Sequence, residues 1–258
     1  MPIRELAKNV PAPLYRLLRR IHNRWQGARP GPALFPGILL GPLLTESAPR
    51  LGWIPGWLNL DDMAHFQLVL ATQSSAGVAG DLLEIGCYHG RSAAFLALHL
   101  QPGERLHLCD AFGLGGGETY GDTPTPEGVR RNLTAAVPEV DPGRISIHRS
   151  LSRNLTLSLD SGLRFAHVDG SHRREDAAND LDLCASHLLP GGVIAVDDYH
   201  HPEYPGVTEA ALAFLASHPE FRILADLNRA GALGRKLYLC RRVASAPKGS
   251  LPCADSAP

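Results

Sequence analysis

The stretch DLLEIGCYHG, residues 81–90, decides how the rest of the chain is interpreted. Its first five residues are mostly apolar and predict a short strand, and residues 91–100, RSAAFLALHL, predict a helix with a wide apolar face. Gly86 and Gly90 bracket the turn between them, where glycine lets the backbone approach a ligand closely and adopt φ values closed to other residues. We therefore expect a strand-turn-helix join that suits a nucleotide-like ligand.

The spacing of these glycines does not fit the dinucleotide-binding fingerprint G-x-G-x-x-G, because no third glycine follows in register. The pattern is Glu-x-Gly-x-x-x-Gly, beginning at Glu84 near the end of the predicted strand. It resembles the first motif of the class I S-adenosylmethionine-dependent methyltransferases, although a purely structural glycine turn is the alternative. The resemblance implies that the turn wraps the methionine part of the cofactor, with Glu84, Gly86, Tyr88, Gly90 and Ser92 at the cofactor site.

Length and composition set the class of protein. The chain has 258 residues, 44% of them hydrophobic, which suits one α/β domain with an extension. A net charge of -1 gives no electrostatic reason to expect nucleic acid as a partner. The five cysteines form no C-x-x-C pair, which favours a reducing cytoplasm. The apolar run at residues 33–44 is broken by Pro36 and Pro42, so we expect neither a signal peptide nor a transmembrane segment.

Residues 1–56 are predicted to be an N-terminal extension, residues 57–242 the methyltransferase domain, and residues 243–258 a disordered tail. Within the extension, residues 13–25 have the spacing of a basic amphipathic helix. Such a helix either docks on its own domain or a second subunit, or makes weak peripheral contact with an anionic membrane. Residues 27–56 are rich in proline and glycine, which predicts an irregular linker or covering arm.

Alternating helix and strand patterns fill the predicted domain. We expect helices at residues 60–72, 91–100, 127–137, 173–188 and 207–217, and strands at residues 81–85, 105–110, 144–148, 164–169, 192–198, 221–227 and 236–241. The last two strands are close enough in sequence to form a hairpin. With the resemblance, this predicts the Rossmann-like class I methyltransferase fold: a mostly parallel seven-stranded sheet with a C-terminal antiparallel hairpin and helices on both faces. Asp110 ends the second strand, where a carboxylate can accept hydrogen bonds from a ribose.

A second pair of stretches carries the chemistry: VDGSH at residues 168–172 and LPGGVIAVDDY at residues 189–199. Together they resemble the metal-dependent class I O-methyltransferases, in particular the sugar O-methyltransferases of macrolide biosynthesis, over roughly residues 57–242. The resemblance places Asp169 after the fourth strand and Asp197 with Asp198 after the fifth. Three carboxylates at one sheet edge repel each other unless a cation joins them, and hard oxygen ligands favour Mg²⁺ over Zn²⁺.

Neighbouring residues of a strand point to opposite faces, so Asp197 and Asp198 can both bind the ion only if the strand has ended there. Otherwise one of them supports the site without touching the ion. The resemblance also implies that His172 is the general base that takes the proton of a sugar hydroxyl. His200 and His201 are the alternatives for that role.

We therefore expect a cytoplasmic, Mg²⁺-dependent O-methyltransferase, assembled as a homo-oligomer, that uses S-adenosylmethionine, bound in part by Asp169. Its acceptor is expected to be a sugar hydroxyl of a glycosylated natural product or of a glycan precursor. Two alternatives remain open: an enzyme that methylates a catechol or another phenol, and a non-catalytic accessory protein that only binds the cofactor.

Overall fold

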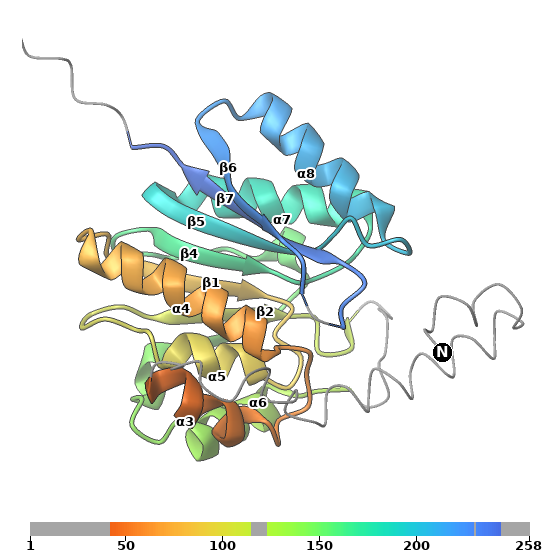
Figure 1. The fold of residues 1–258 in the computed structure, drawn as a ribbon. Coiled ribbons are helices and arrows are strands. Elements are labelled where there is room, and N and C mark those ends of the chain that lie inside the picture. Colours follow the sequence, from red (N-terminus) through yellow and green to blue (C-terminus); the bar gives the residue numbers. More distant parts are fainter. Residues whose placement is uncertain (1–41, 115–122, 230, 244–258) are drawn as a thin grey trace, which may run out of the picture.

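The computed structural model describes residues 42–114, 123–229 and 231–243, and in this part of the chain seven strands form one sheet (Figure 1). Their order is β3-β2-β1-β4-β5-β7-β6, and only β7 runs antiparallel to its neighbours. This confirms the predicted sheet, including its antiparallel end. The strands are β1 Asp81–Ile85, β2 Leu106–Asp110, β3 Ile145–Arg149, β4 Leu163–Val168, β5 Leu188–Tyr199, β6 Phe221–Leu227 and β7 Arg235–Arg241.

Helices cover both faces of the sheet, as predicted. The α-helices are α3 Pro42–Leu51, α4 Leu60–Ser75, α5 Arg91–Ala97, α6 Pro126–Ala136, α7 Arg174–His187 and α8 Pro205–Ser217. Strand residues alternate between the two faces: Leu82 and Tyr238 pack in the core with α3 to α6, while Leu83 and Leu237 pack with α7 and α8. The central strands β1 and β4 are buried along their whole length, so the functional groups gather where these strands end.

Local signals in the sequence set the helix ends. The side chain of Asn59 caps α4 by accepting a hydrogen bond from the N–H of Asp62 at 2.9 Å. In turn, the Asp62 carboxylate accepts a hydrogen bond from the N–H of Asn59 at 3.2 Å. Thr125 caps α6 in the same position, and Pro126 follows as the first helical residue. These caps explain why the predicted starts of α4 and α6 are within a residue of the observed ones.

The extension departs from its prediction. Residues 42–51, expected to be irregular, form helix α3, and Leu51 and Ile54 are fully buried in the core that also holds Phe66. Pro42 does not prevent the helix because the first helical position needs no backbone donor. Arg50 ties α3 to α6 through hydrogen bonds to the carbonyl of Ala136.

The fifth strand is longer than predicted, since it begins at Leu188 and not at residue 192. Leu188 pairs with Leu163, and a register shift then admits the Pro-Gly-Gly segment before Val193 resumes pairing with Phe165.

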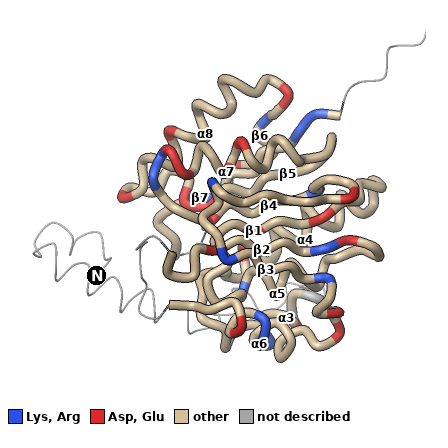
Figure 2. The backbone as a smooth tube through the Cα atoms, turned by 180° about the vertical axis from the view of Figure 1, so that it is seen from behind, with Lys and Arg blue, Asp and Glu red and all other residues tan. Residues whose placement is uncertain are grey.

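Two sequence predictions lie outside the described residues, namely the basic helix at 13–25 and most of the tail. In the described part, no helix has the length and apolar character needed to cross a membrane. Figure 2 shows basic and acidic positions interspersed along the described backbone and not gathered on one side.

Candidate active site

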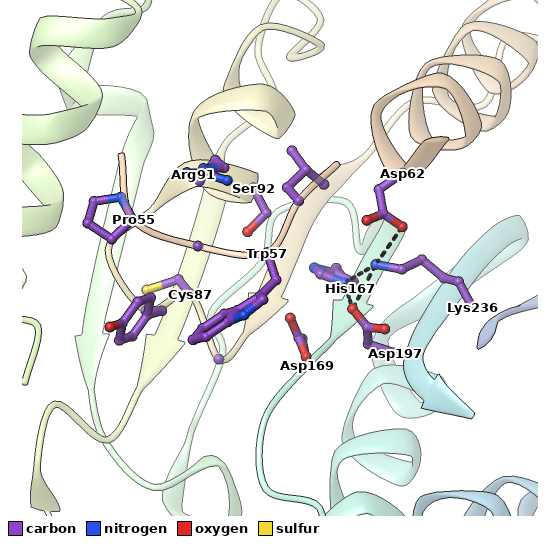
Figure 3. A pocket seen from close by; sticks show the side chains of 14 residues that line it. Pro55, Trp57, Asp62, Cys87, Arg91, Ser92, His167, Asp169, Asp197 and Lys236 are labelled. Atoms are coloured by element: carbon purple, nitrogen blue, oxygen red, sulfur yellow. Dashed lines mark hydrogen bonds and ion pairs between the residues drawn. The ribbon is translucent and has the colours of Figure 1, made fainter. Parts of the chain in front are cut away.

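A cavity opens beside the glycine turn, where β1, β4 and β5 end (Figure 3). One wall comes from the segment before α4, and the others come from the turn, the start of α5, and charged side chains of β4, β5 and β7. The lining residues are Pro55, Gly56, Trp57, Leu58, Asp62, Gly86, Cys87, Tyr88, Arg91, Ser92, His167, Asp169, Asp197 and Lys236. Of the predicted cofactor residues, Gly86, Tyr88, Ser92 and Asp169 therefore face this cavity.

The turn requires both of its glycines. Gly86 has φ +88°, and a Cβ there would lie 2.0 Å from the carbonyl oxygen of Asp169. Gly90 has φ +90°, and its Cβ would lie 2.6 Å from the side chain of Leu133. Because β1 and the segment after β4 approach so closely at Gly86, the turn is brought against Asp169 by backbone packing alone.

Two predicted cofactor acids have different surroundings. The Asp110 carboxylate accepts hydrogen bonds from the N–H groups of Tyr88 at 2.9 Å and Phe112 at 2.8 Å. Burial nevertheless raises the pKa of Asp110. Glu84 is fully buried and does not line the cavity; its Oε1 lies 2.7 Å from Nδ1 of His167, which does. Glu84 therefore reaches the cavity only through His167.

The end of β5 separates its two acids. Asp198 has φ +54°, in the left-handed region, and pairing with β7 shifts register between Val196 and Tyr199. The strand thus continues to Tyr199, but its regular alternation is broken at Asp198. As a result, Asp197 contacts Lys236 and Arg229, whereas Asp198 lies with its Oδ2 3.1 Å from Nε2 of His172.

Asp169 lies at the centre of two overlapping groups of possible metal ligands. Ligand atoms of Asp169, His172 and Asp198 all lie within 4.8 Å of one another, and the same holds for Asp169 with His167 and Asp197. Burial, and after it the charge of Asp197, raises the pKa of Asp169 to about 8. Burial thus favours the uncharged form of this carboxyl group, and a second carboxylate lies close by. A divalent cation fits such a pair, because it stabilises both groups in their charged form.

Of the three histidines considered as the base, His172 is the one that the fold brings to Asp169 and Asp198. Its ring stacks on Tyr204 with centroids 3.8 Å apart and planes 8° from parallel. His201 stacks on Tyr204 as well, and its Nδ1 accepts a hydrogen bond from the N–H of Glu203, while His200 is exposed. In the described part of the chain, neither of these two belongs to a group of possible metal ligands.

Several residues of the site had no signal in the sequence analysis. Asp62 lies in the first turn of α4, Arg229 lies in the loop between β6 and β7, and Trp57, whose ring centroid is 5.2 Å from that of Tyr88, is the first residue of the expected domain. Lys236 did offer a signal, because a lysine at the start of a strongly apolar strand must find a partner when it is buried. Its side chain is only 1% exposed.

Comparisons with known proteins agree with this geometry. Residues 83–199 match a family described as a methyltransferase domain, and no curated protein matches the chain. Among solved structures, the chain is similar to the O-methyltransferase NovP, with 16% identity over 88% of this chain and 99% of that one, at a TM-score of 0.59. An O-methyltransferase from Bacillus cereus in complex with SAH has 17% identity over 81% and 94% of the two chains, at a TM-score of 0.57.

CalS11, a TDP-rhamnose 3'-O-methyltransferase of calicheamicin biosynthesis, has 17% identity over 90% of this chain and 95% of that one, at a TM-score of 0.50. At such identities the likeness is one of fold, and the domain match covers the glycine turn, Asp110 and the three acids of the sheet edge. Residues 83–199 thus match a methyltransferase domain, and the seven-stranded fold of the described chain is similar to that of the solved O-methyltransferases.

Proposed function

We propose that this protein transfers the methyl group of S-adenosylmethionine to a hydroxyl group of a sugar, on a glycosylated natural product or a glycan precursor. The observation that carries the proposal is the position of Asp169, His172 and Asp198 as one compact group beside the glycine turn. That arrangement puts a proton acceptor and a pair of carboxylates next to the place where a class I methyltransferase holds its methyl donor.

In the proposed reaction, the acceptor oxygen attacks the methyl carbon in line with its bond to sulfur, and S-adenosylhomocysteine leaves with the bonding electron pair. His172 takes the hydroxyl proton as the new bond forms. Asp198, 3.1 Å from Nε2, orients the imidazole and stabilises its protonated form. The ring of Tyr204 restricts the imidazole to one plane, so His172 requires little reorganisation before it accepts the proton.

A divalent cation fits the carboxylates at this edge, and we propose Mg²⁺ from the donor chemistry. Asp169 and Asp198 are the carboxylates that lie with His172, and Asp197 is the third acid that the sequence predicts as a ligand. When bound, the ion supplies stabilisation of the negative charge that develops on the acceptor oxygen. The residues of the chain contribute its placement, because Asp169 is fixed by the packing against Gly86.

The choice of a sugar acceptor has two supports. One is the resemblance of the acids and His172 to the sugar O-methyltransferases, and the other is the similarity of the fold to a TDP-rhamnose 3'-O-methyltransferase. An assay with labelled S-adenosylmethionine should show methyl transfer to nucleotide-linked or glycoside-linked deoxysugars, inhibited by EDTA and restored by Mg²⁺. Methyl transfer to catechols alone would show that the acceptor is a phenol and not a sugar. Cofactor binding without transfer to either class would favour a non-catalytic accessory protein.

Cofactor choice is testable separately by calorimetry, in which S-adenosylhomocysteine should bind and NAD should not. The homo-oligomeric state and the cytoplasmic location stay predictions from the sequence.

A further inference from the structure

Four charged side chains form ion pairs with one another beside the cavity. Lys236 Nζ lies 2.9 Å from Asp197 and 3.4 Å from Asp62. The Arg229 guanidinium lies 2.5 Å from Asp197 and 3.6 Å from Asp62. All four are buried, and Figure 3 shows Lys236 directed between the two carboxylates. The two acids and the two cations therefore form a charge-balanced group, which we call the ion quartet.

Glu84 also has a close partner, since its Oε1 lies 2.7 Å from Nδ1 of His167. Asp169 and Asp198 are not part of the ion quartet. Arg229 approaches Asp198 to 3.9 Å, and Oδ2 of Asp198 lies 3.1 Å from Nε2 of His172.

We infer that Lys236 and Arg229 withdraw Asp197 from cation binding, so that a divalent cation at this edge is held through Asp169 and Asp198 alone among the three acids. The inference rests on the cation of the proposed function and divides the predicted three-acid site. Lys236 and Arg229 are positioning residues in this arrangement, since they act on the ion site through Asp197.

The physical reason is the cost of an unpaired buried charge. If Asp197 turned to an ion, Lys236 and Arg229 would lose their shortest carboxylate contacts and keep the longer ones to Asp62, at 3.4 and 3.6 Å. When both are ionised, Asp169 and Asp198 carry two negative charges between them, which a divalent cation neutralises with no remainder. The left-handed residue at Asp198 makes this division possible, because it directs the two neighbouring acids to different partners.

The test replaces one ion pair without changing the net charge. In the full chain, we would measure Mn²⁺ binding by electron paramagnetic resonance for Asp197→Asn combined with Lys236→Met, and for Asp198→Asn. We expect the double variant to bind Mn²⁺ within about 3-fold of the unaltered chain, because it removes one negative and one positive charge together. We expect Asp198→Asn to bind at least about 30-fold more weakly, because it removes a ligand and half the negative charge of the site.

The matched control is Asp226→Asn combined with Arg235→Met, which removes an ion pair of 2.9 Å from the same hairpin, away from the cavity. It should leave Mn²⁺ binding unchanged. A double variant at Asp197 and Lys236 that still binds S-adenosylhomocysteine but has lost Mn²⁺ as fully as Asp198→Asn overturns the inference. Absence of Mn²⁺ binding by the unaltered chain overturns the proposed cation itself, and the inference with it.

A second measurement needs no variant. Crystals of the unaltered chain soaked in Mn²⁺ locate the ion by its anomalous scattering. An ion bonded to Asp169 and Asp198, with Lys236 still on Asp197, supports the inference. A direct bond from the ion to Asp197 contradicts it even if the double variant fails to fold.

Discussion

His172 is fixed from two sides, by Asp198 through its Nε2 and by the ring of Tyr204. The His172→Ala variant should keep its fold and its affinity for S-adenosylhomocysteine. Its kcat should fall by roughly 10² to 10⁴, the usual contribution of a positioned general base. Single-turnover methyl transfer measures this, with the exposed His200→Ala as the control. Near-normal turnover in His172→Ala together with its loss in His200→Ala would assign the base to the other loop.

The Asp110 carboxylate accepts hydrogen bonds from the N–H groups of Tyr88 and Phe112, and we propose that it also accepts hydrogen bonds from a ribose. Asp110→Asn replaces one acceptor oxygen by an amide that cannot accept. We expect S-adenosylhomocysteine to bind about 10- to 100-fold more weakly, or about 1.5 to 3 kcal/mol, by calorimetry. The exposed Asp160→Asn is the control. Equal affinity in the two variants would remove Asp110 from the cofactor site.

Asp180 is a buried acid on α7, outside the active site, with a carboxylate oxygen that has no hydrogen-bond partner. Burial raises its pKa to about 6. The folded state thus binds this proton more tightly than the unfolded state, so the contribution of Asp180 to stability is complete below about pH 4 and is lost as the pH rises through 6.

Asp180→Asn should therefore be as stable as the unaltered chain near pH 4 and more stable at pH 7.5, by up to about 3 kcal/mol. Urea unfolding at the two pH values measures the difference. A stability gap that is the same at both pH values would show that the Asp180 carboxyl group does not titrate as described.

The turn between β1 and α5 lies at the proposed cofactor site, and its geometry depends on the backbone of the segment after β4. Gly86 and Gly103 both have left-handed backbones, with φ +88° and +84°, but only Gly86 meets another segment. The two positions therefore separate backbone strain from steric contact. Each alanine pays roughly 1 kcal/mol for the left-handed conformation.

Gly86→Ala should cost several kcal/mol more than Gly103→Ala, because its Cβ would overlap the carbonyl of Asp169. Thermal unfolding measures the cost. S-adenosylhomocysteine binding should be lost in Gly86→Ala and kept in Gly103→Ala. Similar melting temperatures for the two variants would mean that the turn can move away from β4.

In the molecule as a whole, the domain extends further toward the N-terminus than the composition suggests. Helix α3 and the residues after it pack in the same core as α4 and α5, and Arg91 donates to the carbonyl oxygens of Gly52 and Ile54. This segment then provides Trp57 to the cavity wall. The extension predicted as a separate arm is in this part a structural element of the active site.

Ile54→Ala should destabilise the protein by about 2 to 5 kcal/mol, because it leaves a cavity in a fully buried position. The neighbouring Trp53→Ala, at a side chain that is 54% exposed, should change the stability by less than about 1 kcal/mol. Chemical unfolding of both variants tests this. If both changes were small, the segment before α4 would be a loosely attached arm after all.

The sequence by itself determined the order of strands and helices, the glycine turn and the acids at the strand ends. Such features are local: periodicity, caps and turn glycines act within a few residues, and the parallel strands put their carboxyl ends at one edge. His172 and Asp169 were named from the resemblance of residues 168–172 to the sugar O-methyltransferases, and not from spacing alone. The prolines misled the analysis of α3, because Pro42 begins the helix, where no backbone donor is needed, and Pro49 lies inside it without ending it.

Only the tertiary structure decided which charges meet. Asp62, Arg229 and Lys236 come from a helix start, a turn and the last strand, and no spacing in the sequence connects them with Asp197. The partition of Asp197 and Asp198 between two sets of partners follows from one left-handed residue and a shift in strand register. Coulombic energy and desolvation depend on distance and burial in space, so the sequence could name the acids but not the partner of each one.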